Sequence, residues 1–229
     1  MRALAAALLL AVAPGLAFAQ QTPPAVPAPP AEAEPVIRNR PVSGFVVDAR
    51  GVLAKFGQRP LTATALGVTA ADLPGPGLGG SIGAHVYPLR FGNVALGAGG
   101  ELLLARRSRQ PIDGAGEPAG ANQKARLFSI APQVSLNFGN RNGWSYVSGG
   151  IGTASFETWP ELETMPDRRV RAINYGGGAR WFRSPHLAFT VDLRFYAISP
   201  GLAAGTGTGP DAERPRQRLM VISAGISVR

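Results

Sequence analysis

Few residues in this chain could carry out nucleophilic chemistry. GGSIG, residues 79–83, matches the G-x-S-x-G pattern, in which a serine nucleophile sits on a sharp turn between a strand and a helix. His85 shares a strand face with Ser81, but four strand residues separate the two by roughly 13 Å, too far for a hydrogen bond. The flanking residues predict a continuous strand, so we expect no catalytic serine here.

Cofactor and metal motifs are equally weak. GPGLGG, residues 75–80, matches the dinucleotide pattern G-x-G-x-x-G, but a proline lies inside it and a strand follows, whereas the mechanism needs a helix N-terminus. The chain has no cysteine, and its two histidines, His85 and His186, are far apart. We therefore expect no enzyme, no cofactor and no metal.

Two charged residues interrupt an otherwise apolar run, LAFTVDLRFYA at 187–197. Successive strand side chains point to opposite faces. The run therefore has an apolar face and a second face that carries Asp192 and Arg194. A soluble sheet could turn its polar face to water, whereas a membrane barrel would turn its apolar face to lipid and its polar face inward.

Other segments repeat this division between faces. The polar faces together carry three acidic and three basic residues, with one histidine on the same side: Asp48, Arg50, His85, Glu101, Arg180, Asp192 and Arg194. An eight-stranded barrel is only wide enough for side chains to fill it, so charges inside it must pair. We predict a structural charge network in the lumen. The alternative is a solvated polar face on an open sheet.

The chain divides into three parts. Residues 1–19 have the basic start, apolar stretch and A-x-A site of a signal peptide, with cleavage expected after Ala19. Residues 20–40 are rich in Pro and Ala and are expected to form a disordered linker. Residues 41–229 form the predicted folded domain. The absence of cysteine excludes a disulfide scaffold.

Alternating patterns predict eight strands, near 43–55, 78–88, 93–106, 125–138, 143–156, 169–182, 187–198 and 217–229. The second, fourth and sixth strands are followed by tight turns, and the other links are long, at 57–77, 107–124, 157–168 and 199–216. This rhythm is typical of an up-and-down membrane barrel with short periplasmic turns and long outer loops.

The predicted outer face is apolar across the middle of seven strands, and it places Tyr175 and Trp181 where interfacial aromatic residues could lie. In the fifth strand, either the odd-numbered or the even-numbered residues could form the outer face. Pro132 in mid-strand cannot donate a ladder hydrogen bond, so we expect a bulged or irregular ladder there.

The net charge of +9 and the pI near 11.1 would suggest nucleic acid for a cytosolic protein. The export signal and the scattered arginines argue against that partner. Exposed arginines are better explained by anionic headgroups or sugar phosphates at a membrane surface.

With its export signal, eight strands, alternating loops and GGIG- and GGGA-type strand glycines, the chain resembles the OmpA/OmpX-type outer-membrane β-barrel family. The resemblance implies an all-β, eight-stranded, antiparallel up-and-down transmembrane β-barrel in the bacterial outer membrane. It implies outer-membrane lipid, lipopolysaccharide and the barrel-insertion machinery as partners. Family members usually end in an aromatic residue, whereas this sequence stops at Arg229.

The sequence thus predicts an outer-membrane barrel with a structural or interaction role and surface-exposed loops whose extracellular partner is unknown. Two alternatives remain open at this point. One is a narrow porin-like pore through a lumen that is rich in small residues. The other is a soluble, lipocalin-like barrel that binds an apolar ligand, which would require an apolar interior.

Overall fold

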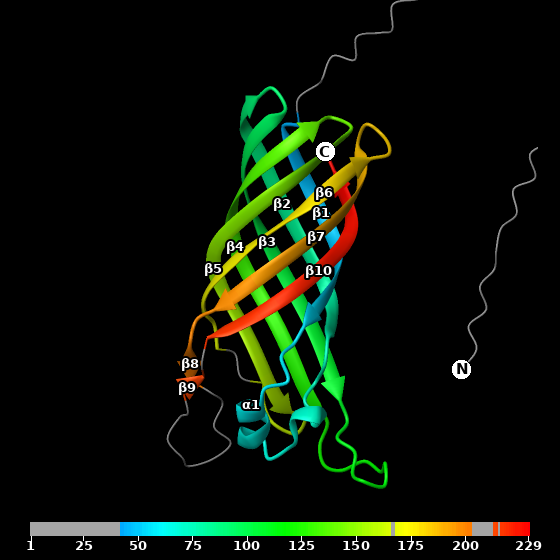
Figure 1. Cartoon of the computed structure of the whole chain (residues 1–229), viewed down its shortest axis with the longest axis vertical. Helices are drawn as coiled ribbons and strands as arrows, with labels where there is room; N and C mark the ends of the chain where they lie inside the picture. The colour runs from blue at the N-terminus through cyan, green and yellow to red at the C-terminus, as the bar shows by residue number, and fades with distance from the viewer. Residues whose placement is uncertain (1–41, 166–167, 203–212, 215) are drawn as a thin grey trace, which may run out of the picture. The chain divides into compact units, whose positions relative to one another are not determined.

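The computed structural model describes residues 42–165, 168–202, 213–214 and 216–229 (Figure 1). The predicted signal peptide and linker lie outside the described residues. None of the helices in the described part of the chain is long and apolar enough to cross a membrane.

Within the described residues, eight antiparallel strands close a barrel, in the order β1-β10-β7-β6-β5-β4-β3-β2. A short ribbon of β8 and β9 lies in the link between β7 and β10. The strands are β1 (Phe45–Lys55), β2 (Gly77–Phe91), β3 (Val94–Arg109), β4 (Gln123–Asn140), β5 (Gly143–Pro160), β6 (Val170–Phe182), β7 (Leu187–Ile198), β8 (Gly201–Leu202), β9 (Glu213–Arg214) and β10 (Gln217–Val228). The predicted fold class and all eight predicted strands are confirmed.

Short and long connections alternate as predicted. The tight turns after β2, β4 and β6 lie at the same end of the barrel as the end of β10, and the longer links lie at the other end (Figure 1). The β1–β2 link holds a short helix, α1 (Pro60–Ala65), and a 3₁₀ turn, η1 (Ala70–Asp72), which the sequence reading missed. Both elements are held by local features. Pro60 begins α1, and at the start of η1 the backbone N–H and the hydroxyl of Thr69 both donate hydrogen bonds to the Asp72 carboxylate.

Side chains along the strands alternate between the buried lumen face and the exposed outer face, as expected. In β7, Asp192 and Arg194 are each 2 % exposed, whereas Leu193 between them is 42 % exposed. The ambiguous strand β5 turns Trp144 and Tyr146 inward, and Trp144 packs beside Tyr87 and Phe182. Large aromatic rings that find ring partners inside the barrel decide the parity of this strand.

The ladder at Pro132 is irregular, as expected, although it contains no bulge. Pairing of β4 with β5 is interrupted at residues 131–132, yet the register is the same on both sides, so no extra residue is inserted. The register shift lies instead in β2, between Val86 and Leu89, where Pro88 lacks a donor.

The lumen is layered along the barrel axis. Along β1, Val46 is followed by Asp48 and Arg50 and then by Val52 and Ala54, all of them buried. Val46 belongs to a turn-side layer made of Val42, Val46, Tyr87, Ala95, Trp144, Tyr146 and Phe182. The charged residues therefore lie between two apolar layers.

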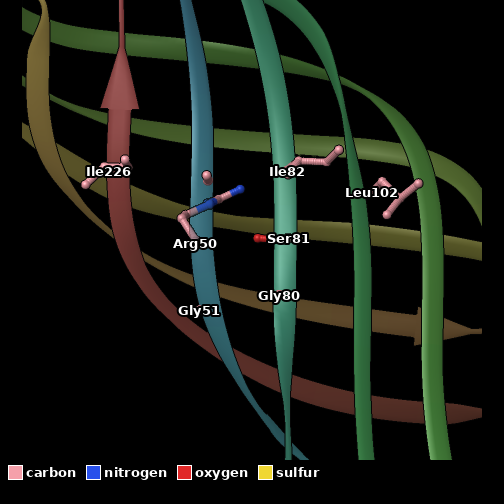
Figure 2. A pocket seen from close by; sticks show the side chains of 8 residues that line it. Arg50, Gly51, Gly80, Ser81, Ile82, Leu102 and Ile226 are labelled. Carbon is pink, nitrogen blue, oxygen red and sulfur yellow. The ribbon is translucent and has the colours of Figure 1, made fainter.

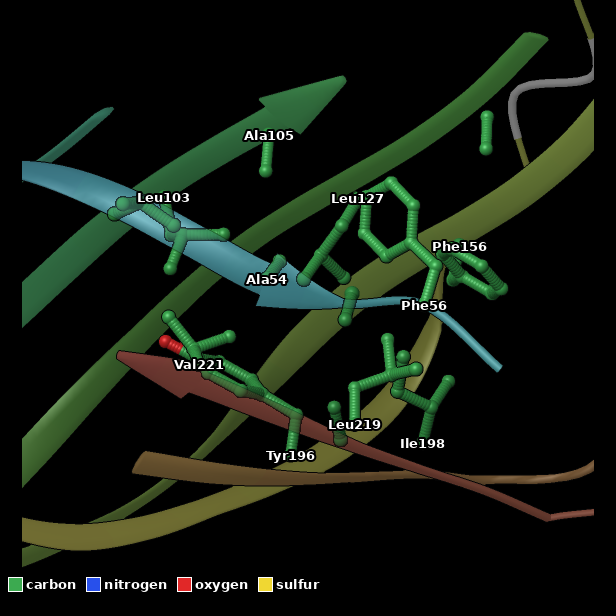
Figure 3. Packing of buried hydrophobic residues seen from close by; sticks show 14 residues of the cluster. Ala54, Phe56, Leu103, Ala105, Leu127, Phe156, Tyr196, Ile198, Leu219 and Val221 are labelled. Carbon is green, nitrogen blue, oxygen red and sulfur yellow. The ribbon is translucent and has the colours of Figure 1, made fainter. Parts of the chain in front are cut away.

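The second apolar layer, the loop-side layer, is larger. Figure 3 shows its side chains from several strands converging on one another, with Phe56 and Phe156 among them. The centroids of these two rings are 4.9 Å apart. The layer also contains Leu103, Leu127, Tyr196, Ile198, Leu219 and Val221.

Some glycines allow adjacent strands to pack at close range. A Cβ atom on Gly79 would lie 1.9 Å from the carbonyl oxygen of Leu104, whereas one on Gly80 would lie 3.6 Å from that of Arg50. We predict that Gly79→Ala destabilises the barrel by about 1–3 kcal/mol because β3 must shift.

Gly80→Ala is the matched control, since its added methyl group makes an ordinary contact. Urea unfolding of both variants measures the difference. Equal stabilities would contradict the close strand approach at Gly79.

Candidate functional site

The first element of the lumen site is an ion pair between β1 and β6. Arg180 donates hydrogen bonds to both carboxylate oxygens of Asp48, from Nε at 3.1 Å and from Nη2 at 2.6 Å. Ser227 of β10 donates to the same carboxylate. The Arg180 guanidinium also lies 4.2 Å from the ring centroid of Tyr146. One buried acid thus connects three strands.

The second element is a closed cycle of four alternating charges, which we term the charge ring: Arg50, Glu101, Arg194 and Asp192. Arg50 bonds Glu101 and lies 3.4 Å from Asp192. Arg194 lies 3.0 Å from Asp192 and 3.6 Å from Glu101. Because every charge has two neighbours of opposite sign, the pairing offsets much of the cost of burial.

Neutral polar groups complete the charge ring. Tyr196 donates to Glu101 at 2.7 Å, and Tyr146 donates to Asp192 at 2.8 Å. Arg194 donates to Ser148 at 2.8 Å, and its Nη1 reaches Asn174 at 3.2 Å. Hydrogen bonds with one ionised partner are the stronger kind, so these groups hold the ring in one geometry.

Six of the seven lumen residues chosen from the sequence are therefore in contact with one another in two groups. His85 is the exception. It is 7 % exposed, its ring lies against the backbone of Gly99, and neither ring nitrogen has a hydrogen-bond partner among the described residues.

The sequence reading did not include the uncharged partners. Tyr196 and Ser227 lie on the lumen face by parity, but an uncharged side chain gives no signal of its partner. Tyr146 could not be assigned to the lumen because the sequence did not determine which alternate residues of β5 face inward. Among the described residues, no three His, Cys, Asp or Glu side chains are grouped to hold a metal ion.

The outer face is a continuous apolar belt. Exposed large apolar side chains lie on all eight barrel strands, for example Val47, Ile82, Leu96, Val134, Val147, Ile173, Leu193 and Ile222. Outward cationic residues lie where the strands approach the long loops: Lys55, Arg106, Arg126, Arg171 and Arg218. The belt therefore has a charged border on the long-loop side.

A hollow of about 550 Å³ lies on this outer face across β10, β1, β2 and β3 (Figure 2). Gly51 and Gly80 form part of its lining, and Ile82, Leu102 and Ile226 project around it. The hollow exists because adjacent glycines leave the wall of the barrel without side chains. Behind it lie Arg50 and Ser81, whose side chains belong to the buried face.

A basic cluster, which we term the basic rim, lies at the long-loop end of β3, β4 and β6: Arg106, Lys124, Arg126 and Arg169. Arg126 and Arg169 lie 5.7 and 5.2 Å from the ring centroid of Phe128. Lys124 pairs with Glu161 at 2.7 Å. Hydrogen bonds from Lys124 and Asn122 hold the pKa of the exposed Glu161 carboxyl below its usual value.

No family model and no curated protein matches the sequence. Solved structures do. The chain is 15% identical to Neisserial surface protein A, with a TM-score of 0.50 over 81% of this chain and 97% of that one. Ail of Yersinia pestis, in complex with the heparin analogue sucrose octasulfate, is 12% identical, with a TM-score of 0.44 over 80% and 95%. OprG of Pseudomonas aeruginosa is 11% identical, with a TM-score of 0.46 over 84% and 98%.

At such identities the likeness shows the fold alone. The chain has the eight-stranded fold of OmpA/OmpX-type outer-membrane β-barrels, as the sequence predicted.

The Asp48–Arg180 pair gives a direct test of the lumen. Arg180→Met leaves the Asp48 carboxylate buried without its main partner, so we expect a loss of about 3–5 kcal/mol in the free energy of unfolding. Adding Asp48→Asn removes the unpaired charge and should restore most of that loss. Denaturant titration of the refolded single and double variants measures both changes in the free energy of unfolding. If Arg180→Met alone were as stable as the wild type, the Asp48–Arg180 pair would not stabilise the barrel.

Proposed function

We propose that the protein is an outer-membrane barrel with a structural or interaction role. Its apolar belt would contact lipid, and the four long links would be presented on the outer surface. The short turns after β2, β4 and β6 would face the periplasm, on the side from which an exported chain arrives.

The observation that carries this proposal is the inverted distribution of polarity. Large apolar side chains are exposed around the whole barrel, while Arg50, Arg180 and Arg194 are buried inside it. A barrel in water would expose a patch far larger than soluble monomers tolerate. In a bilayer the same surface is matched to hydrocarbon, and the outward cations at its border are matched to anionic headgroups.

The layered lumen supports a closed barrel over a conducting one. Apolar layers lie on both sides of the charge ring, so an ion moving along the axis would have to cross two regions without polar partners. We therefore favour a structural or interaction role over a porin-like pore. We propose no catalytic activity for the lumen site, because its carboxylates, Asp48, Glu101 and Asp192, are engaged by guanidinium groups.

Insertion is the step that outer-membrane machinery would carry out, and β10 is the segment that it would recognise. Its outward positions are apolar: Met220, Ile222, Ala224, Ile226 and Val228. After the strand, Arg229 bonds the carbonyl groups of Pro185 and Arg141, and its guanidinium lies 3.7 Å from the ring centroid of Phe182. A cation at this position thus holds two short turns together.

Cell fractionation combined with gel migration tests the location. We expect the protein in the outer-membrane fraction, and we expect it to migrate differently before and after boiling, because a closed barrel resists detergent. Recovery of the folded protein in the soluble periplasm would overturn the proposal.

The lipid-facing assignment has its own test. Leu193→Arg puts a cation on the outer face in the middle of β7, and we expect a cost of about 2–4 kcal/mol with loss of stable insertion into vesicles.

Leu162→Arg is the control, because Leu162 is 89 % exposed in the β5–β6 link. The fraction of each variant that becomes heat-modifiable in lipid vesicles is the measurement. Normal insertion of Leu193→Arg would contradict the assignment of this face to lipid.

A further inference from the structure

The three short turns are joined to one another by hydrogen bonds. The amide of Gly139, in β4, donates to the carbonyl group of Asn93 in the β2–β3 turn at 2.8 Å. The amide of Phe182, at the end of β6, donates to the carbonyl group of Asn142 in the β4–β5 turn, also at 2.8 Å. Arg229 joins the β4–β5 turn to the β6–β7 turn. We term this braced surface the turn face: residues 90–93, 139–142, 183–186 and Arg229.

The turn face carries exposed cations and no acidic side chain. Arg90, Arg141 and Arg183 are exposed, one at each turn. Burial and the neighbouring Arg141 hold the pKa of the Arg229 guanidinium below its usual value, so like charges gather here. The described segments at this end of the barrel contain no Asp or Glu: residues 42–47, 86–95, 138–147, 180–191 and 224–229. The positive charge of this end therefore has no side-chain counterion among the described residues.

The guanidinium groups of the turn face have hydrogen-bond donors available. Within the described part of the chain, the side chains of Arg141 and Arg183 make no hydrogen bond or ion pair. Arg90 donates only from Nε, to the carbonyl group of Tyr87 at 3.1 Å. A guanidinium presents its donors as a planar fork that matches the two oxygens of a carboxylate. The turn face is therefore suited to a partner that carries several carboxylates.

Two cations of the turn face lie on the lumen side of the barrel wall, away from the lipid-facing belt. Arg90 is paired in the ladder with Ala95, which is buried in the turn-side layer. The guanidinium of Arg229 lies against Phe182, which packs on the same layer. The outward positions at this end hold large apolar side chains such as Trp181. This placement favours a partner beyond the membrane surface over a lipid headgroup.

We propose that the turn face binds carboxylate groups of peptidoglycan, the anionic polymer of the periplasm, with Arg90, Arg141 and Arg183 as donors. This inference rests on the proposed outer-membrane location, in which the short turns face the periplasm. Peptidoglycan repeats its carboxylates along a polymer, so several guanidinium groups can be engaged at once. Because hydrogen bonds already hold the turns together, binding has to order little of the protein.

The test measures how much of the full chain, refolded in detergent micelles, sediments with purified peptidoglycan sacculi. We expect the wild type to sediment with the sacculi. A triple variant with Arg90→Gln, Arg141→Gln and Arg183→Gln should bind about tenfold more weakly, the sum expected for three exposed ion pairs. Arg229 is left unchanged because it braces the turns. Binding of the triple variant equal to that of the wild type would overturn the proposal.

The matched control removes three exposed cations from the long-loop end of the barrel: Arg107→Gln, Arg109→Gln and Arg218→Gln. This control has the same net charge as the turn-face variant, so it separates the position of the cations from their number. It should bind sacculi like the wild type. Equal weakening by the two triple variants would show non-specific attraction and overturn the proposal.

Two further probes identify the chemistry of the partner. Sacculi whose carboxylates have been converted to amides should no longer retain the wild type, and retention equal to that of untreated sacculi would contradict carboxylate recognition. Phosphatidylglycerol added to the micelles should leave sacculus binding in place. If it abolished binding at an equal concentration of charge, the turn face would be a lipid-contacting surface and the proposal would fail.

Folding of the variants is checked separately by heat-modifiable migration. Arg183→Gln alone keeps the proposal testable if the triple variant does not fold, because the Arg183 side chain makes no contact that the fold requires. It should weaken sacculus binding by about twofold, and unchanged binding would count against the proposal. A barrel that inserts but does not bind sacculi refutes this inference alone, whereas a barrel that does not insert refutes the proposed function.

Discussion

The fold depends on charges that are excluded from solvent and therefore require partners. Asp48, Glu101 and Asp192 lie inside a barrel too narrow to hydrate them, and each carboxylate is reached by at least one guanidinium. A buried charge that loses its partner costs several kcal/mol, a large part of the stability of a typical domain. The geometry of pairing therefore restricts how the strands can be arranged.

The two apolar layers make this requirement strict. The turn-side and loop-side layers cover the charged residues from both ends, so water cannot easily replace a missing partner. Glycines such as Gly79 and Gly178 allow neighbouring backbones to approach, which keeps the lumen narrow. Packing and charge pairing thus depend on one another.

Much of this organisation could be predicted from the sequence because a strand has a period of two. Parity placed Asp192 and Arg194 on one face and Leu193 on the other, and the structure has the same arrangement. Parity identifies a face but not a partner. It could not show that Arg180 meets Asp48 rather than Asp192, because that depends on strand register and barrel closure.

Elements with weak periodicity were harder to predict. The parity of β5 was set by contacts of Trp144 with rings on other strands, and α1 is held by local hydrogen bonds within one loop. The basic rim was also missed as a cluster, since Arg106 and Arg126 become neighbours only through the pairing of β3 with β4.

The position of Asp48 has a consequence for assembly. Its partners Arg180 and Ser227 are 132 and 179 residues away along the chain, so the first strand cannot satisfy its acid until the sixth and the last barrel strands are in place. A half-built sheet would leave this carboxylate without them. Pairing of β1 with β10 should therefore be cooperative and occur late in assembly. Few partly assembled barrels in which these two strands are still unpaired should be stable.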